Sequence, residues 1–71
     1  MYVAMYGERV REFSAEKGMS KRGLAAAVGI TPKTARRAER GEAVTRDTAV
    51  GIAEQLGVTP RSIARVVRAR S

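Results

Sequence analysis

The sequence contains neither cysteine nor histidine. The absence of cysteine excludes a disulfide framework and a thiol nucleophile, and the absence of both residues removes the usual ligands of zinc. Histidine is also the commonest general base in enzymes, and the seven acidic residues are scattered singly along the chain. We therefore expect no enzymatic activity, no metal ion and no cofactor.

Tryptophan is absent and only three residues are aromatic, so the core must consist of aliphatic side chains and methionine. The sequence has no run of about 18 apolar residues, the length that a membrane-spanning helix needs. The first ten residues lack the basic start and long apolar stretch of a secretory signal, so we expect a cytoplasmic protein. The length of 71 residues predicts one domain, residues 1–71, with a small core.

Positive charge is what the chain has in excess. The formal net charge is +7 and the pI is about 11.1. Residues 20–46 hold seven basic and two acidic residues, and residues 60–71 hold four arginines and no acid. Two segments therefore carry the excess, which favours a polyanionic partner such as nucleic acid.

Helical periodicity and helix-capping residues occur along the whole chain, and no segment shows the alternation typical of a strand. We therefore predict an all-α fold of five short helices, the first over about residues 3–17. Its apolar face would contain Val3, Tyr6, Val10 and Phe13. The predicted caps of the later helices are Ser20, Thr31, Thr45 and Thr59, and the predicted helix ends are Gly18, Gly29, Gly41 and Gly57. The predicted inward-facing residues of helices two to four are Leu24, Ala27, Val28, Ala35, Ala38, Ala49, Ile52, Ala53 and Leu56.

The second and third predicted helices meet at a short corner. Only residues 29–31 separate them, and such a glycine-containing turn forces two helices to cross steeply, as in a helix-turn-helix at residues 20–40. Four basic residues of the third helix point away from the inward-facing alanines: Lys33, Arg36, Arg37 and Arg40. One interpretation is a basic helix that enters the DNA major groove. The alternative is a solvated helix face, which is what most charge runs are.

Three stretches carry a resemblance to a known family: "GMSKRGLAAAVGIT", "ERG" and "AVGIAEQLGVTPRSI". Together they resemble Cro/C1-type, phage-repressor-like helix-turn-helix domains, over residues 7 to about 63. The resemblance implies a five-helix, lambda-repressor-like domain that binds double-stranded DNA. It also implies a short, Cro-like transcriptional repressor that binds a palindromic operator as a homodimer.

The resemblance assigns roles to individual positions. The positions that match base-contacting residues are Thr31, Pro32, Lys33, Arg36 and Arg37. Those that match phosphate-contacting residues are Ser20, Lys21, Arg22, Thr34, Arg40 and Arg46. Pro32 departs from the family because many members carry glutamine there; its lack of a donor shifts base contact to the neighbouring cations and favours guanine.

Two further positions leave alternatives open. In many members of the family, the position of Ser14 carries an arginine that pairs with an acidic residue at the position of Glu39. Because this chain lacks that arginine, Glu39 would pair with Arg9 or Lys17, or lie partly exposed.

The last predicted helix has an apolar face that either makes a dimer contact or covers the core of one chain: Ile63, Val66 and Val67.

Two rival functions are weighed against a DNA-binding regulator. An antitoxin-like module would use its first and last helices to bind a protein partner. A basic amphipathic membrane binder is disfavoured, because five short, well-capped helices are not a single long amphipathic one.

Overall fold

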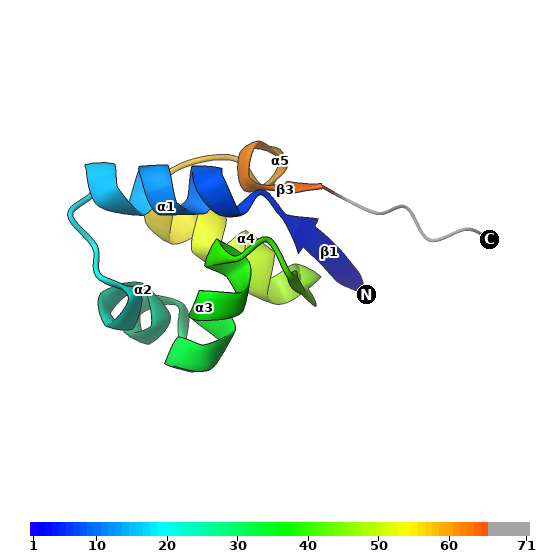
Figure 1. Ribbon diagram of the computed structural model, residues 1–71, viewed down its shortest axis with the longest axis horizontal. Coiled ribbons are helices and arrows are strands. Elements are labelled where there is room, and N and C mark those ends of the chain that lie inside the picture. The colour runs from blue at the N-terminus through cyan, green and yellow to red at the C-terminus, as the bar shows by residue number, and fades with distance from the viewer. Residues whose placement is uncertain (66–71) are drawn as a thin grey trace.

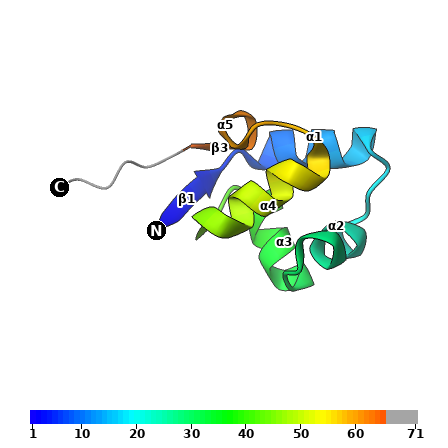
Figure 2. The ribbon, with the colours of Figure 1, turned by 180° about the vertical axis from the view of Figure 1, so that it is seen from behind.

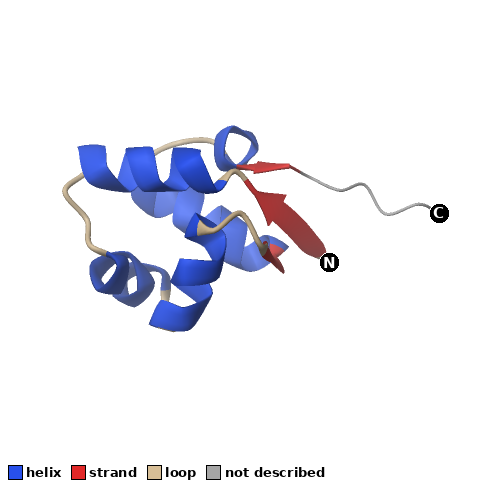
Figure 3. Cartoon of the chain, in the orientation of Figure 1, coloured by secondary structure: helices blue, strands red, loops and turns tan. Residues whose placement is uncertain are grey.

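The structure is a computed structural model that describes residues 1–65, and it combines helices with a small sheet (Figure 1, Figure 3). In chain order its elements are β1 (Tyr2–Met5), α1 (Gly7–Glu16), α2 (Lys21–Val28), α3 (Pro32–Glu39), β2 (Ala43–Thr45), α4 (Arg46–Leu56), α5 (Pro60–Ile63) and β3 (Ala64–Arg65). The number of helices agrees with the prediction, but the class is not strictly all-α. None of the helices in this part of the chain is long and apolar enough to cross a membrane.

The sheet corrects the prediction for the N-terminus. β1 lies in the middle of the order β2-β1-β3 and pairs antiparallel with both neighbours. Val3 pairs with Val44, and Met5 pairs with Ala64. Val3 and Met5 are buried while Tyr2 is exposed, so the true period of this segment is two. The predicted first helix is confirmed over Gly7–Glu16, but its predicted start at residue 3 was wrong, because strands of four residues or fewer are too short for alternation to show in the sequence.

The predicted helix boundaries from residue 20 onward are largely confirmed. The Ser20, Thr31 and Thr45 hydroxyls each accept a hydrogen bond from the backbone N–H three residues later, at 3.0–3.2 Å. Gly29 and Gly57 end α2 and α4 with φ of 85° and 71°, in the left-handed region that favours glycine. These caps explain why α2, α3 and α4 are short and begin where the sequence predicted.

The core lies between α1, α4 and the sheet, with α2 and α3 packed below it in Figure 1. Its largest fully buried side chains are Leu24, Ile52, Ile63, Val3 and Val10. Ala35 and Ala38 of α3 are buried as predicted. Ala27 was wrongly predicted to face inward, since it is exposed and Ala25 takes the buried position. The predicted apolar face of the last helix is only partly described, because α5 ends at Ile63, and Val66 and Val67 lie outside residues 1–65.

Ser14 is the buried polar residue of this core. It is 5% exposed, and its hydroxyl has no hydrogen-bond partner among the described residues. An unpaired buried hydroxyl destabilises the folded state, because it gives up its hydrogen bonds to water.

We predict that Ser14→Ala stabilises the protein by about 1 kcal/mol, which corresponds to a rise in Tm of about 4–8 °C for a domain of this size. Thermal unfolding followed by circular dichroism measures the change. Ser20→Ala is the matched control: the Ser20 hydroxyl caps α2, so its removal lowers Tm. A lower Tm for Ser14→Ala would show that its hydroxyl is satisfied.

Candidate nucleic-acid interface

The corner between α2 and α3 is closed by backbone hydrogen bonds. The N–H groups of Gly29 and Ile30 both donate to the Ala25 carbonyl, at 2.8 and 2.9 Å. Ala25 itself is 1% exposed, and its small side chain suits the close approach of the two helices. Figures 1 and 2 show α2 and α3 side by side at one end of the molecule, away from α5. The turn therefore presents α3 on an outer surface.

The solvent-facing side of α3 is basic. Its side chains Lys33, Arg36, Arg37 and Arg40 are exposed, whereas Ala35 and Ala38 are fully buried. Positions 33, 36, 37 and 40 follow the three- and four-residue spacing that aligns side chains on one helix face. The structure thus brings the predicted cations of α3 together on one surface, which we call the α3 face.

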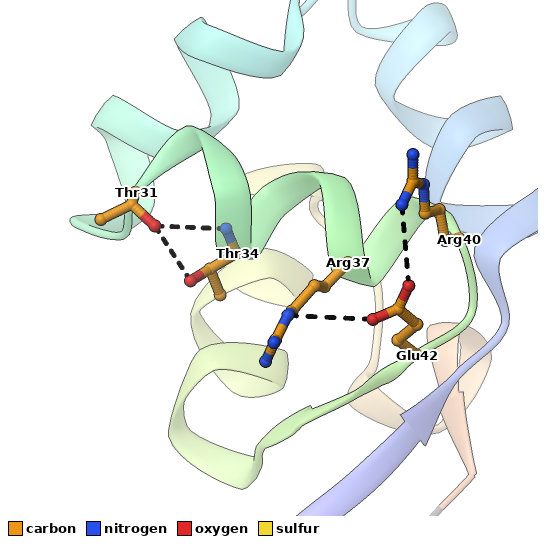
Figure 4. A network of polar contacts seen from close by, with 5 residues as sticks. All are labelled: Thr31, Thr34, Arg37, Arg40 and Glu42. Atoms are coloured by element: carbon orange, nitrogen blue, oxygen red, sulfur yellow. Dashed lines mark hydrogen bonds and ion pairs between the residues drawn. The ribbon is translucent and has the colours of Figure 1, made fainter.

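The N-terminus of α3 is held by two threonines. The Thr31 hydroxyl accepts from the Thr34 N–H at 3.2 Å, and the two hydroxyl oxygens lie 3.0 Å apart (Figure 4). Pro32 occupies the first helical turn, where its missing N–H costs no hydrogen bond. Thr31 and Pro32 are exposed and Thr34 is half-buried, so this end of α3 is both rigid and accessible.

Glu39 pairs with Lys21, which was predicted to contact a phosphate and was not predicted as a partner of Glu39. Its carboxylate lies 3.6 Å from Lys21 Nζ, and Arg11 of α1 donates to the Glu39 backbone carbonyl. Arg9, one of the predicted partners, instead donates to the Ser62 carbonyl at 3.2 Å. Lys17, the other predicted partner, is likewise not paired with Glu39 in the described part of the chain. The Lys21–Glu39 pair therefore joins the start of α2 to the end of α3.

Glu42 contacts two cations of the α3 face. One of its carboxylate oxygens lies 3.8 Å from Arg37 Nε and the other 4.0 Å from Arg40 Nη1 (Figure 4). All three side chains are about half exposed or more, at 48–65%. These contacts are ion pairs open to solvent, which contribute little to stability.

A concave region of about 280 Å³ lies beside the Lys21–Glu39 pair. It is lined by Arg11, Lys21, Arg36, Glu39 and Arg40. Four cations therefore surround one carboxylate, which leaves positive charge facing solvent. Lys21, Arg36 and Arg40 were predicted from the sequence to contact DNA, whereas Arg11 was not. The only signal for Arg11 was its position off the apolar stripe of the first helix.

Gly7 is a second residue that the sequence analysis missed. A Cβ atom at Gly7 would lie 2.8 Å from Gly41 N and 2.9 Å from the Glu39 carbonyl carbon. The first residue of α1 thus packs directly against the backbone at the end of α3. Nothing in the sequence near Gly7 indicates this contact, because its partners are more than 30 residues away.

The remaining predicted phosphate-contacting residues are divided between two places. Ser20, Lys21 and Arg22 are exposed at the start of α2, although the Ser20 hydroxyl is already engaged as the helix cap. Arg46 is the first residue of α4 and lines a different groove, of about 700 Å³, with Arg61 and Arg65. The apolar lining of this groove, which we call the β1–α5 groove, includes Val3, Val50, Pro60 and Ala64.

Ile63 is not available as a contact between two chains. Its side chain is fully buried in the core of a single chain, and its carbonyl accepts from the Tyr6 N–H at 2.7 Å. Of the two alternatives for the last helix, Ile63 therefore agrees with the one in which the helix covers the core of one chain. Val66 and Val67, the other two residues of that predicted contact, lie outside the described residues.

The chain belongs to the Cro/C1-type helix-turn-helix family. The helix-turn-helix family model HTH_3 matches residues 8–69, most of the chain. This confirms the resemblance drawn from the sequence.

Two solved structures are similar to this chain. The restriction-modification controller protein C.AhdI from Aeromonas hydrophila is 32% identical, with a TM-score of 0.72 over 78% of this chain and 85% of that one. The clp gene regulator ClgR from Corynebacterium glutamicum is 30% identical, with a TM-score of 0.71 over 79% of this chain and 61% of that one. This chain thus spans less than two thirds of ClgR. No curated protein matches it.

Proposed function

We propose that this protein is a sequence-specific, double-stranded-DNA-binding transcriptional regulator, acting as one helix-turn-helix domain. The observation that carries the proposal is the α3 face: a capped helix, held at a rigid corner, that turns four cations to solvent over a buried alanine side. An α-helix fits the major groove of B-form DNA, where each base pair presents a distinct pattern of donors and acceptors. The similar structures support a regulatory role, since one is a gene regulator and the other a controller protein.

Base contact falls to the exposed residues of α3. Arg37 and Arg36 carry guanidinium groups able to donate two hydrogen bonds to guanine O6 and N7, and Lys33 can donate to the same atoms. Thr31 and Pro32, at the exposed start of α3, supply short side chains for apolar or hydroxyl contact. We therefore propose that the recognised sequence contains guanine at the positions facing Arg36 and Arg37.

Phosphate contact falls to residues on either side of α3. Lys21 and Arg22 at the start of α2, with Arg40 at the end of α3, would lie along the DNA backbones that border the groove. Ser20 and Thr34 add hydroxyl groups at the two helix starts. Arg46 is farther along the chain, at the start of α4, and would extend the contact along one strand.

We propose that two copies bind one operator and repress transcription by occupying it. α3 has eight residues and is about 12 Å long, so one helix covers only a few base pairs. Two copies related by a two-fold axis would place their α3 helices about 34 Å apart, on half-sites separated by one helical turn. The operator is then an inverted repeat.

Selection of bound sequences from a random pool of duplex DNA tests this function. The expected result is enrichment of a guanine-containing inverted repeat with half-sites one turn apart. The affinity for the selected site should fall about 10⁴-fold between 50 and 200 mM salt, since about eight phosphate contacts by cations, four from each copy, release counterions. No enrichment would show that the basic surface binds DNA without sequence preference; a single asymmetric site would contradict the homodimer.

The β1–α5 groove favours one second candidate, binding of a protein partner. The groove is lined by three arginines and by no acidic residue from the described part of the chain. An acidic segment with apolar side chains would fit its charge and its lining. Purification of the tagged protein from its host, followed by mass measurement of the intact complex, would show a partner in fixed stoichiometry. If Arg61→Glu abolished binding of the partner and left DNA binding unchanged, the β1–α5 groove would be the binding site of the partner.

A further inference from the structure

The backbone holds Glu42 in a defined place beside α3. Gly41 has φ of 82° and its N–H donates to the Ala38 carbonyl at 3.1 Å, while the Glu42 N–H donates to the Arg37 carbonyl at 2.9 Å. This pair of hydrogen bonds is the glycine-based motif that ends many helices. The next residue, Ala43, starts β2 and pairs with β1. The Glu42 backbone is therefore anchored on both sides.

The side chain of Glu42 returns toward two cations of the α3 face. Its carboxylate lies near Arg37 Nε, on one side of that guanidinium, so that the terminal nitrogens of Arg37 remain directed away from it (Figure 4). Arg40 Nη1 is 4.0 Å away on the other carboxylate oxygen. One acid thus partly offsets the charge of two arginines and leaves free the terminal nitrogens of Arg37, which bond guanine.

Glu42 differs in this respect from Glu39. Glu39 is 14% exposed and faces Lys21 at 3.6 Å, whereas Glu42 is 48% exposed and its two pairs are longer, at 3.8 and 4.0 Å. Exposed ion pairs of this length are easily exchanged for another anion. A DNA phosphate that approaches Arg37 or Arg40 must therefore displace Glu42 or accept its repulsion.

We propose that Glu42 is a specificity-determining residue of the α3 face, a role that rests on the proposed function. It lowers the affinity of Arg37 and Arg40 for phosphates on any DNA, because its negative charge opposes the phosphate. On the recognised site it opposes only the phosphate contact of Arg40, because Arg37 there reaches a guanine edge with its terminal nitrogens while Nε stays beside Glu42. Glu42 thus increases the ratio of the affinity for the recognised site to the affinity for random DNA.

Glu42→Gln tests the role, with Glu54→Gln as the matched control. Both changes remove one negative charge and keep the side-chain shape. Glu54 is exposed on α4 and forms no ion pair with residues 1–65. We expect Glu42→Gln to bind random duplex DNA about twofold to fivefold more tightly than Glu54→Gln, the effect expected of an exposed ion pair. The slope of log affinity against log salt should become steeper by up to about 0.9, the equivalent of one phosphate contact. Affinity for the selected site should rise by a smaller factor, because only Arg40 contacts a phosphate there, and Tm should stay the same.

Elution from heparin, a polyanion without base edges, separates the possible failures. We expect Glu42→Gln to elute at higher salt than Glu54→Gln although their net charges are equal. Equal elution, or an equal ratio of specific to random affinity in the two variants, would overturn the role of Glu42 while leaving the proposed function standing. If the unmodified protein selects no sequence but Glu42→Gln still elutes later, the proposed function is wrong. Glu42 would then weaken the binding of polyanions by Arg37 and Arg40 but would have no role in specificity.

Discussion

Gly7→Ala is expected to destabilise the protein by about 3 kcal/mol or more, because its new methyl group has no space. The Cβ atom would lie within 2.9 Å of Gly41 N and the Glu39 carbonyl carbon, closer than real Cβ atoms approach backbone. Neither neighbour is the end of a flexible side chain, so α1 or the end of α3 must move. Domains of 71 residues are stable by only about 4–11 kcal/mol in total, so this loss is a large fraction.

The effect should reach beyond stability to the α3 face. The Glu39 carbonyl that the methyl group would strike also accepts the hydrogen bond from Arg11. Displacement of α1 therefore disturbs the end of α3, where Glu39, Arg40 and Glu42 lie. Thermal unfolding by circular dichroism should show a Tm lower by about 12 °C or more.

Gly23→Ala is the control for this prediction. Gly23 lies in α2, and a Cβ atom there meets only the Ser20 hydroxyl oxygen, at 3.2 Å. Alanine is also the better helix former, so the two small effects oppose each other and Tm should change by a few degrees at most. Equal losses of Tm in the two variants would show that α1 does not pack against α3 as described.

The parts of the fold that the sequence predicted are those that local chemistry determines. The Ser20, Thr31 and Thr45 caps act on N–H groups three residues away, and Gly29 and Gly57 adopt their left-handed conformation within one turn. Such signals need no knowledge of distant residues. The basic side of α3 was predictable for the same reason, since helical spacing alone separates Arg36 and Arg37 from the buried alanines.

The parts that the sequence did not predict depend on distant partners. β1 is a strand because Val44 and Ala64, some 40 and 60 residues further along, pair with it. Its four residues contain an apolar spacing that also fits a helix, and local propensity could not decide between the two. Gly7, Arg11 and the Lys21–Glu39 pair likewise gain their roles only from contacts between α1, α2 and α3.

Arg37→Ala is expected to weaken binding to the selected DNA site by about 1–3 kcal/mol, or roughly fivefold to 150-fold, if Arg37 bonds guanine with two hydrogen bonds. Random DNA offers no matched guanine, so its affinity should fall much less. Repeating the selection with the variant should show one base pair of each half-site at which the preference is lost. Arg37 is 55% exposed, so its loss should leave Tm nearly unchanged and separate binding from folding.

Lys21→Ala is the control variant for Arg37→Ala, because it removes a proposed phosphate contact instead of a proposed base contact. Lys21 lies at the start of α2, where it would contact a phosphate, so its loss should weaken binding to every sequence by the same factor. It should also reduce the salt slope by about one. Measured side by side on selected and random DNA, the two variants distinguish base contact from phosphate contact. Equal losses on both DNAs for Arg37→Ala would assign Arg37 to the DNA backbone. Base recognition would then be assigned to Lys33 and Arg36, the other two α3 cations predicted to contact bases.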